Sequence, residues 1–191
     1  MPAILEITRS RLRQKLLSHF FTNPEASLYL REIASLLRED PGNLSKELAQ
    51  LARSGTFLSK VRGNQKYFSL NKDYPLYKEL KSIIFKTVGV EGSLKEIIAN
   101  ARGINFSFIY GSFANRREQS SSEIDLLIVG SPDENKLMEK IESLEKNLCR
   151  QINYNIYSPK EFKEKLKKKD TFILNILKRP KIVLKGNLNA I

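Results

Sequence analysis

The stretch that decides the fold of the C-terminal half is GSFANRREQSSSEIDLLIVG, residues 111–130. Gly111 and Ser112 directly follow an apolar, strand-like run over residues 104–110, and residues 123–130 form a second such run. Glu123 and Asp125 alternate in the second run, so in a strand both carboxylates point to one face, about 7 Å apart along the chain. Two carboxylates on one face can together hold Mg²⁺ and a triphosphate.

The residues between the glycine and the acids are suited to phosphate. Gly111 lets backbone approach a phosphate closely, and Ser112 with the N–H groups after it begins a helical turn that attracts anions. Arg116 and Arg117 lie in the connecting loop, within reach of phosphate oxygens. The segment therefore predicts a nucleotide-binding set and a metal-binding, catalytic pair: Gly111, Ser112, Arg116 and Arg117, with Glu123 and Asp125.

The flanking sequence completes a small α/β domain. Apolar periodicity predicts helices over residues 93–102, 135–150 and 171–178, and strands over residues 151–157 and 181–186. Ser158 and Glu161 form a capping box that opens one more helix.

The GSFANRREQSSSEIDLLIVG segment resembles the minimal nucleotidyltransferase domain of the polymerase-β superfamily. The signature of that family is Gly-Ser after a strand, then about ten residues, then two acids one residue apart. The resemblance spans about residues 91–187 and implies a mixed sheet and Mg²⁺-dependent nucleotide transfer. In that family a third acid, on a neighbouring strand, helps to hold the metal and takes the proton of the attacking hydroxyl.

Three positions depart from the family pattern. Glu123 stands where the family usually has Asp, and Arg116 where it often has glycine. No third acid is found, because one face of the candidate strand carries only Gln151, Asn153, Asn155 and Tyr157. Asparagine can offer a carbonyl oxygen to a metal but cannot act as a general base at neutral pH. We therefore expect a degenerate domain that binds a nucleotide weakly, with Mg²⁺ at most weakly held, and transfers little or none.

The N-terminal residues predict a different module. Helices are expected over residues 8–21 and 31–38, and a third begins after Asp40, which is a good N-cap, with Pro41 at its first position. Strand-forming residues 56–61 and 66–70 then flank a turn that contains Gly63-Asn64. These elements, over about residues 8–72, resemble a winged-helix DNA-binding domain of small bacterial and archaeal regulators.

This resemblance implies that the third helix enters a major groove and that the hairpin tip lies along phosphates. Amide side chains can read adenine edges, and cationic side chains read guanine or phosphate. The predicted DNA-binding residues are Asn43, Ser45, Lys46, Gln50 and Arg53 on the helix, and Lys60, Arg62 and Lys66 on the hairpin. A winged helix that only contacts protein is the alternative.

Composition agrees with a polyanionic partner. Lys and Arg number 33 against 21 Asp and Glu, which gives a net charge of +12. The single cysteine, Cys149, excludes an internal disulfide, and no apolar run approaches the ~20 residues that span a bilayer. The N-terminus has no signal-peptide pattern, so a cytoplasmic location with no membrane association follows by elimination.

The sequence thus predicts a two-domain α+β protein: a winged helix-turn-helix over residues 1–72, a connector helix within 73–90 and a nucleotidyltransferase-like domain over 91–191. Tyr77, Leu80 and Ile84 form an apolar stripe on the connector and are the candidate contact of a homodimer.

The leading functional hypothesis is a transcriptional regulator that binds double-stranded DNA. In this hypothesis the degenerate domain binds a nucleotide or mediates assembly. The alternative is a Mg²⁺-dependent nucleotidyltransferase that modifies nucleic acid or protein. By resemblance to the antitoxins among minimal family members, a toxin-like protein partner is included in that alternative.

Overall fold

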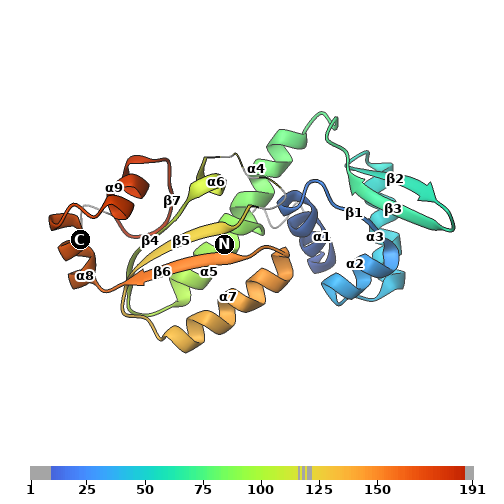
Figure 1. The fold of residues 1–191 in the computed structure, drawn as a ribbon. Coiled ribbons are helices and arrows are strands. Elements are labelled where there is room, and N and C mark those ends of the chain that lie inside the picture. The colour runs from blue at the N-terminus through green and yellow to red at the C-terminus, as the bar shows by residue number, and fades with distance from the viewer. Residues whose placement is uncertain (1–9, 116, 118, 120–121, 188–191) are drawn as a thin grey trace. The chain divides into compact units, whose positions relative to one another are not determined.

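The computed structural model describes residues 10–115, 117, 119 and 122–187 of the chain. It divides into two compact units, residues 1–92 and 93–191, each described by itself below (Figure 1). Among the described residues no helix has the length and apolar character needed to cross a membrane.

The first unit combines helices with one small antiparallel sheet. Its elements are α1 (Arg11–Thr22), β1 (Ser27–Tyr29), α2 (Leu30–Leu37), α3 (Pro41–Arg53), β2 (Phe57–Arg62), β3 (Gln65–Leu70) and α4 (Tyr77–Thr87). The sheet order is β1-β3-β2, so the hairpin β2–β3 forms one side of the sheet and the short β1 the other.

The α2–α3 corner forms as local sequence predicts. Arg38 ends α2 in the left-handed conformation, with φ of 53°. The Asp40 side chain accepts a hydrogen bond from the Asn43 backbone N–H at 2.9 Å, and Pro41 takes the first helical position. The inward face of α3 is buried in the core of the unit and consists of Leu44, Leu48 and Leu51.

The β2–β3 hairpin turns through Gly63 and Asn64, since Arg62 pairs with Gln65. Gly63 has φ of +58°, which glycine adopts without a steric penalty. The predicted hairpin is confirmed, and its tip projects from the body of the unit (Figure 1).

The apolar stripe on α4 packs inside its own unit. Ile84 is buried, and Tyr77 and Leu80 pack against the core that contains α1. The Phe21 and Tyr77 rings are 5.6 Å apart, and the Ser18 hydroxyl donates to the Val88 carbonyl at 2.9 Å. Tyr77 and Leu80 remain partly exposed, so a dimer contact through this stripe stays a prediction.

Helix α5 (Val90–Asn100) begins three residues before the predicted start at Ser93 and includes Gly92. A Cβ at Gly92 would lie 1.7 Å from the Thr87 carbonyl oxygen, so glycine allows the start of α5 to approach the end of α4.

The second unit is built on a mixed four-stranded sheet, as predicted. After α5 its elements are β4 (Ile104–Tyr110), α6 (Gly111–Ala114), β5 (Ile124–Gly130), α7 (Glu134–Leu148), β6 (Ile152–Tyr157), α8 (Pro159–Lys167), α9 (Thr171–Lys178) and β7 (Ile182–Lys185). The strand order is β6-β5-β4-β7. Strands β5 and β6 are parallel through the α7 crossover, and the other pairs are antiparallel.

The two faces of this sheet are covered by different helices. Phe108 of β4 and Leu127 of β5 belong to one buried cluster with Phe162 of α8 and Ile173 of α9. Helices α5 and α7 lie on the other side of the sheet (Figure 1). Since side chains alternate along a strand, Glu123 and Asp125 share the face of Leu127, which is the α8–α9 face.

Candidate functional site

The two acids of the signature lie at one end of the sheet. Asp125 is the second residue of β5, and Glu123 comes immediately before this strand. Asp125 is paired with Tyr110, the last residue of β4, on one side and with Asn153 of β6 on the other. The acids therefore lie beside Gly111, where the chain leaves β4.

Gly111 is required by its contact with Asp125. Its φ is +74°, and a Cβ built on it would lie 2.2 Å from the Asp125 Oδ2 atom. A side chain here would displace the carboxylate as well as strain the backbone. The sequence predicted that Gly111 lets the backbone approach a phosphate closely. In the structure, the absence of a side chain at Gly111 lets the Asp125 carboxylate lie against the main chain.

The segment after Gly111 makes a single helical turn, α6. Both the backbone N–H and the side-chain amide of Asn115 donate to the Gly111 carbonyl, at 3.2 and 2.9 Å. The Arg117 N–H donates to the Ser112 carbonyl at 3.0 Å, and the Arg117 side chain is exposed. Of the predicted nucleotide-binding residues, Gly111 and Ser112 thus adjoin the acids, while Arg116 lies outside the described residues.

Amides, rather than a third acid, occupy the neighbouring strand. The Asn153 side-chain amide donates a hydrogen bond to Glu123 Oε2, and the Asn155 amide donates to the Tyr110 hydroxyl at 3.3 Å. The register between β5 and β6 places Asn153 directly beside Asp125 and Asn155 beside Leu127. Asn153 is therefore the residue at the position nearest the acid pair, a choice that strand alternation alone left open.

Burial and like charge act together on the site. Burial, and secondarily the nearby Glu123 carboxylate, raises the pKa of Asp125. Burial is also the main cause that raises the pKa of Tyr110, with the Asp125 charge adding to it. In the described part of the chain no cluster of three or more His, Cys, Asp or Glu residues could hold a metal. A divalent cation here would have Glu123 and Asp125 as its anionic ligands.

Arg150 is a positioning residue that the sequence did not single out. It is buried, and its Nη1 atom donates to the carbonyls of Gln119 and Ser122, at 2.9 and 3.0 Å, in the loop that leads to the acids. Its guanidinium also lies 6.0 Å from the Phe113 ring centre. Its partners are about 30 positions away in sequence, so no local pattern indicates this role.

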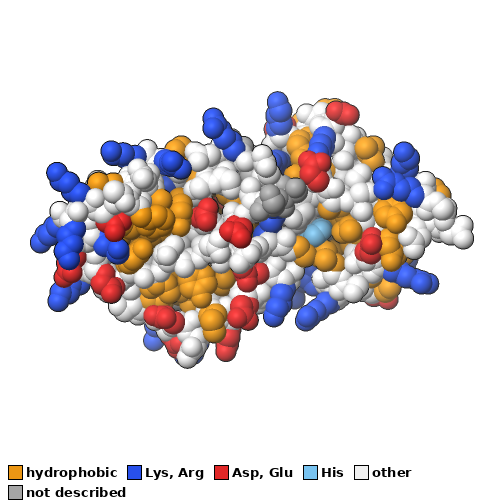
Figure 2. Space-filling view, viewed as in Figure 1, with side chains coloured by type: hydrophobic (Ala, Val, Ile, Leu, Met, Phe, Trp, Pro, Cys, Tyr) orange, Lys and Arg blue, Asp and Glu red, His pale blue; other side chains and the backbone are white. Residues whose placement is uncertain are grey.

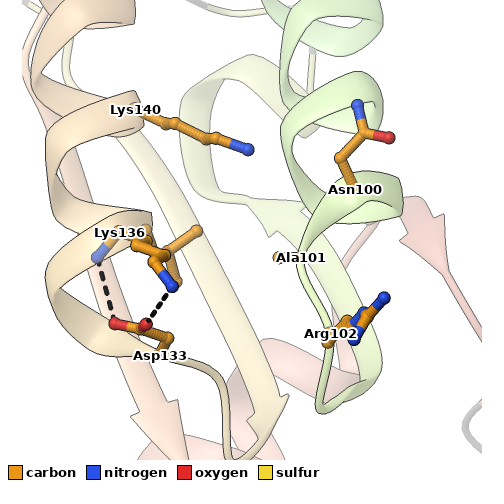
Figure 3. Close-up of a pocket in the computed structure, with 7 residues that line it drawn as sticks. Asn100, Ala101, Arg102, Asp133, Lys136 and Lys140 are labelled. Atoms are coloured by element: carbon orange, nitrogen blue, oxygen red, sulfur yellow. Dashed lines mark hydrogen bonds and ion pairs between the residues drawn. The ribbon is translucent and has the colours of Figure 1, made fainter.

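A separate pocket of about 410 Å³ lies between α7 and the C-terminal end of α5 (Figure 3). Asp133 forms an ion pair with Lys136 at 3.1 Å, and Lys140 extends across the pocket toward α5. The remaining lining residues are Asn100, Ala101, Arg102 and Leu137. Asp133 follows the far end of β5, so this pocket is not part of the site around Asp125.

The predicted DNA-binding side chains are exposed on the first unit. On α3 these are Asn43, Ser45, Lys46, Gln50 and Arg53, and on the hairpin they are Lys60, Arg62 and Lys66. Basic side chains are also spread over both units, and Figure 2 shows a concentration of them at the end formed by α8. Positive charge is therefore not confined to the predicted DNA-binding surface.

The hairpin cations do not form one cluster. Lys60 and Arg62 share a face with Tyr67, and the Arg62 guanidinium lies 5.2 Å from the Tyr67 ring centre. Lys66 is on the opposite face, 5.6 Å from the Phe68 ring centre. Gln50 is also held by a residue that the sequence did not single out, because Arg13 of α1 donates to its Oε1 atom at 2.7 Å.

Comparison with known proteins identifies the family. The model of the family described as polymerase beta, nucleotidyltransferase matches residues 92–187, just over half of the chain. The chain belongs to the polymerase beta nucleotidyltransferase family. The described β4–Gly111–α6–β5 arrangement, with its paired acids, lies within the matched residues.

Solved structures give more distant likenesses. Reduced HlyU from Vibrio cholerae N16961 is 22% identical over 42% of this chain and 77% of that chain, with a TM-score of 0.33. A toxin-antitoxin with AMP-PNP is 14% identical over 52% of this chain and 76% of that chain, with a TM-score of 0.38. A mutant of the toxin-antitoxin MntA-HpeT is 14% identical over 53% of this chain and 77% of that chain, with a TM-score of 0.39. No curated protein matches the sequence.

Proposed function

We propose that this nucleotidyltransferase-family chain is a DNA-binding transcriptional regulator whose second unit binds a nucleotide without transferring it efficiently. The observation that carries the proposal is the position of Asn153, an amide where an active site would need an acid. Asn153 lies beside Asp125 and donates its amide to Glu123, at the position nearest the acid pair. A neutral amide cannot remove the proton from an attacking hydroxyl, so the site lacks the group that activates an acceptor.

The donor set around the acids is compatible with Mg²⁺ but sparse. Glu123 and Asp125 supply carboxylate oxygens, which hard divalent cations prefer. When bound, Mg²⁺ would neutralise triphosphate charge and orient it beside Gly111 and Ser112. The Asn153 amide, which donates to Glu123 Oε2, offsets part of the repulsion between the two carboxylates. Weak, Mg²⁺-dependent nucleotide binding follows.

The first unit is proposed to bind duplex DNA as a winged helix. Support comes from the capped α2–α3 corner, the exposed donors along α3 and the projecting hairpin with Lys60 and Arg62 on one face. In this arrangement α3 enters a major groove and the hairpin contacts the sugar–phosphate backbone. The net charge of +12 favours association with a polyanion.

Duplex binding by the full chain is the direct test of the regulator proposal. At low salt, gel shifts with random-sequence duplexes should show binding, and selection from a randomised pool should enrich a defined sequence. Replacing the α3 donors Lys46 and Arg53 with Ala should weaken duplex binding and reduce the enrichment of the defined sequence. An intact, folded protein that shifts no duplex at low salt would overturn the proposal.

The enzyme alternative rests on the retention of Glu123 and Asp125 next to Gly111. It requires an acceptor, which is nucleic acid, this chain or a toxin-like protein partner. Robust label transfer from a nucleoside triphosphate, abolished by Asp125→Asn, would establish this alternative.

A further inference from the structure

Arg13 connects α1 to the exposed surface of α3 through two side chains. Its Nε atom forms an ion pair with Glu47, and its Nη2 atom donates to Gln50 Oε1 at 2.7 Å. The Arg13 and Glu47 side chains are only 30% and 12% exposed. A guanidinium that meets two partners at once through a planar fork is held in one orientation.

The chemistry of arginine fixes the orientation of the Gln50 amide. A guanidinium carries only N–H donors, so it contacts the amide oxygen of Gln50 and never the NH₂ group. Among the described residues the side-chain amide of Gln50 has no other hydrogen-bond partner, so both of its side-chain N–H bonds are unengaged. The outward-facing function of this side chain is therefore hydrogen-bond donation.

A donor-only glutamine has a different base preference from a free one. A free glutamine pairs with adenine by accepting from N6–H and donating to N7. Here the oxygen already accepts from a cation, which disfavours a further N–H donor at its second lone pair and polarises the amide N–H groups. The major-groove edge of guanine offers two acceptors, O6 and N7, and complements donors alone.

We propose that Arg13 is a specificity-determining residue that holds Gln50 as a donor, so that Gln50 selects guanine over adenine. This inference rests on the proposed binding of duplex DNA. Arg13 itself need not touch a base, because its effect passes through the orientation of the Gln50 amide.

The experiment is selection of randomised duplexes by the full chain, followed by competition binding at the base pair whose identity depends on Gln50. That base pair is located with Gln50→Ala, which should flatten the preference there and leave the rest of the site unchanged. Arg13→Ala/Glu47→Ala removes both members of the ion pair and avoids leaving Glu47 as an unpaired, largely sheltered charge. Its fold is checked by circular dichroism and thermal melting.

The wild type should prefer guanine to adenine at this base pair by about tenfold, within the range of a good side-chain–base contact. In Arg13→Ala/Glu47→Ala the preference should move toward adenine by about tenfold or more, and the same change in a Gln50→Ala background should have no effect. Arg13→Lys provides a second variant, because an ammonium keeps the charge beside Glu47 but lacks the fork that also reaches Gln50. It should shift the preference in the same direction.

Duplex binding with the same base preference in wild type, Arg13→Lys and Arg13→Ala/Glu47→Ala would overturn the Arg13 inference alone. A wild-type preference for adenine at the Gln50-dependent position would also overturn it. Absence of any duplex binding by the wild type would overturn both this inference and the regulator proposal.

Discussion

Asp125 is the residue on which the chemistry of the second unit depends. Burial and the Glu123 carboxylate raise its pKa in the folded chain above the value of about 3.9 in an unfolded one. Ionisation of Asp125 therefore opposes folding. The contribution of the neutral Asp125 carboxyl group to stability is complete below the unfolded pKa and is lost as the pH rises through the folded pKa.

Asp125→Asn should therefore raise the unfolding temperature of the chain at pH 7, and the increase should disappear toward pH 4. Thermal melts at several pH values measure this. Asp133→Asn is the matched control, because hydrogen bonding to Lys136 lowers the pKa of Asp133 and its loss should give no increase at pH 7. A decrease in stability of Asp125→Asn at pH 7 would contradict the account of the site.

Gly111 provides a second prediction at the residue scale. Gly111→Ala combines a positive φ with a Cβ 2.2 Å from Asp125 Oδ2. Gly63→Ala is a control for the backbone term alone, since φ there is +58° and no atom lies within 4 Å of the added Cβ. Gly63→Ala should cost about 1–2 kcal/mol, and Gly111→Ala should cost more. Urea unfolding compares them, and equal costs would show that the carboxylate moves aside freely.

At the scale of elements, the hairpin β2–β3 has different cations on its two faces. If the face with Tyr67 lies along phosphates, Lys60→Ala/Arg62→Ala should reduce the slope of log K against log salt by about 0.9 for each lost phosphate contact. Lys66→Ala, on the other face, should change the slope less. Duplex titrations over a range of salt concentrations measure the slopes. A larger effect of Lys66→Ala would indicate that the opposite face contacts DNA.

Most elements were predictable because their signals are local. The Asp40 cap, the Gly63-Asn64 turn and the Ser158–Glu161 capping box all act within four residues, and each forms as predicted. The sequence shows less about packing between elements. Helix α5 begins at Val90 and not at Ser93, and the close approach of Gly92 to Thr87 is not visible in helix propensity.

The candidate site was likewise predictable from local signals and not in its contacts between strands. The spacing of Glu123 and Asp125 indicated one strand face, but the choice between Asn153 and Asn155 depends on the register of β6, which sequence alternation does not specify. Arg13 is 34 and 37 positions from its two partners, so only the fold brings them together. Long-range polar contacts of this kind carry no periodic signal.

At the scale of the whole molecule, the chain joins a basic, helix-rich unit to a member of the polymerase beta nucleotidyltransferase family. The proposed regulator uses the first unit for DNA and the second for a nucleotide or for assembly. A homodimer contact through Tyr77, Leu80 and Ile84 of α4 stays a prediction, and Tyr77 and Leu80 are its partly exposed members. The residues assigned to the two proposed activities lie in different units, so variants in one unit test one activity at a time.

The most direct test of the central claim measures nucleotide binding and nucleotide transfer on the same preparation of the full chain. Calorimetry with Mg²⁺ and each nucleoside triphosphate should show weak binding that is lost in Asp125→Asn, since one of two anionic ligands is removed. Incubation with labelled triphosphates, with and without duplex DNA, should show no transfer by the wild type, and at most a trace by Asn153→Asp. Robust transfer by the wild type that Asp125→Asn abolishes would contradict the account.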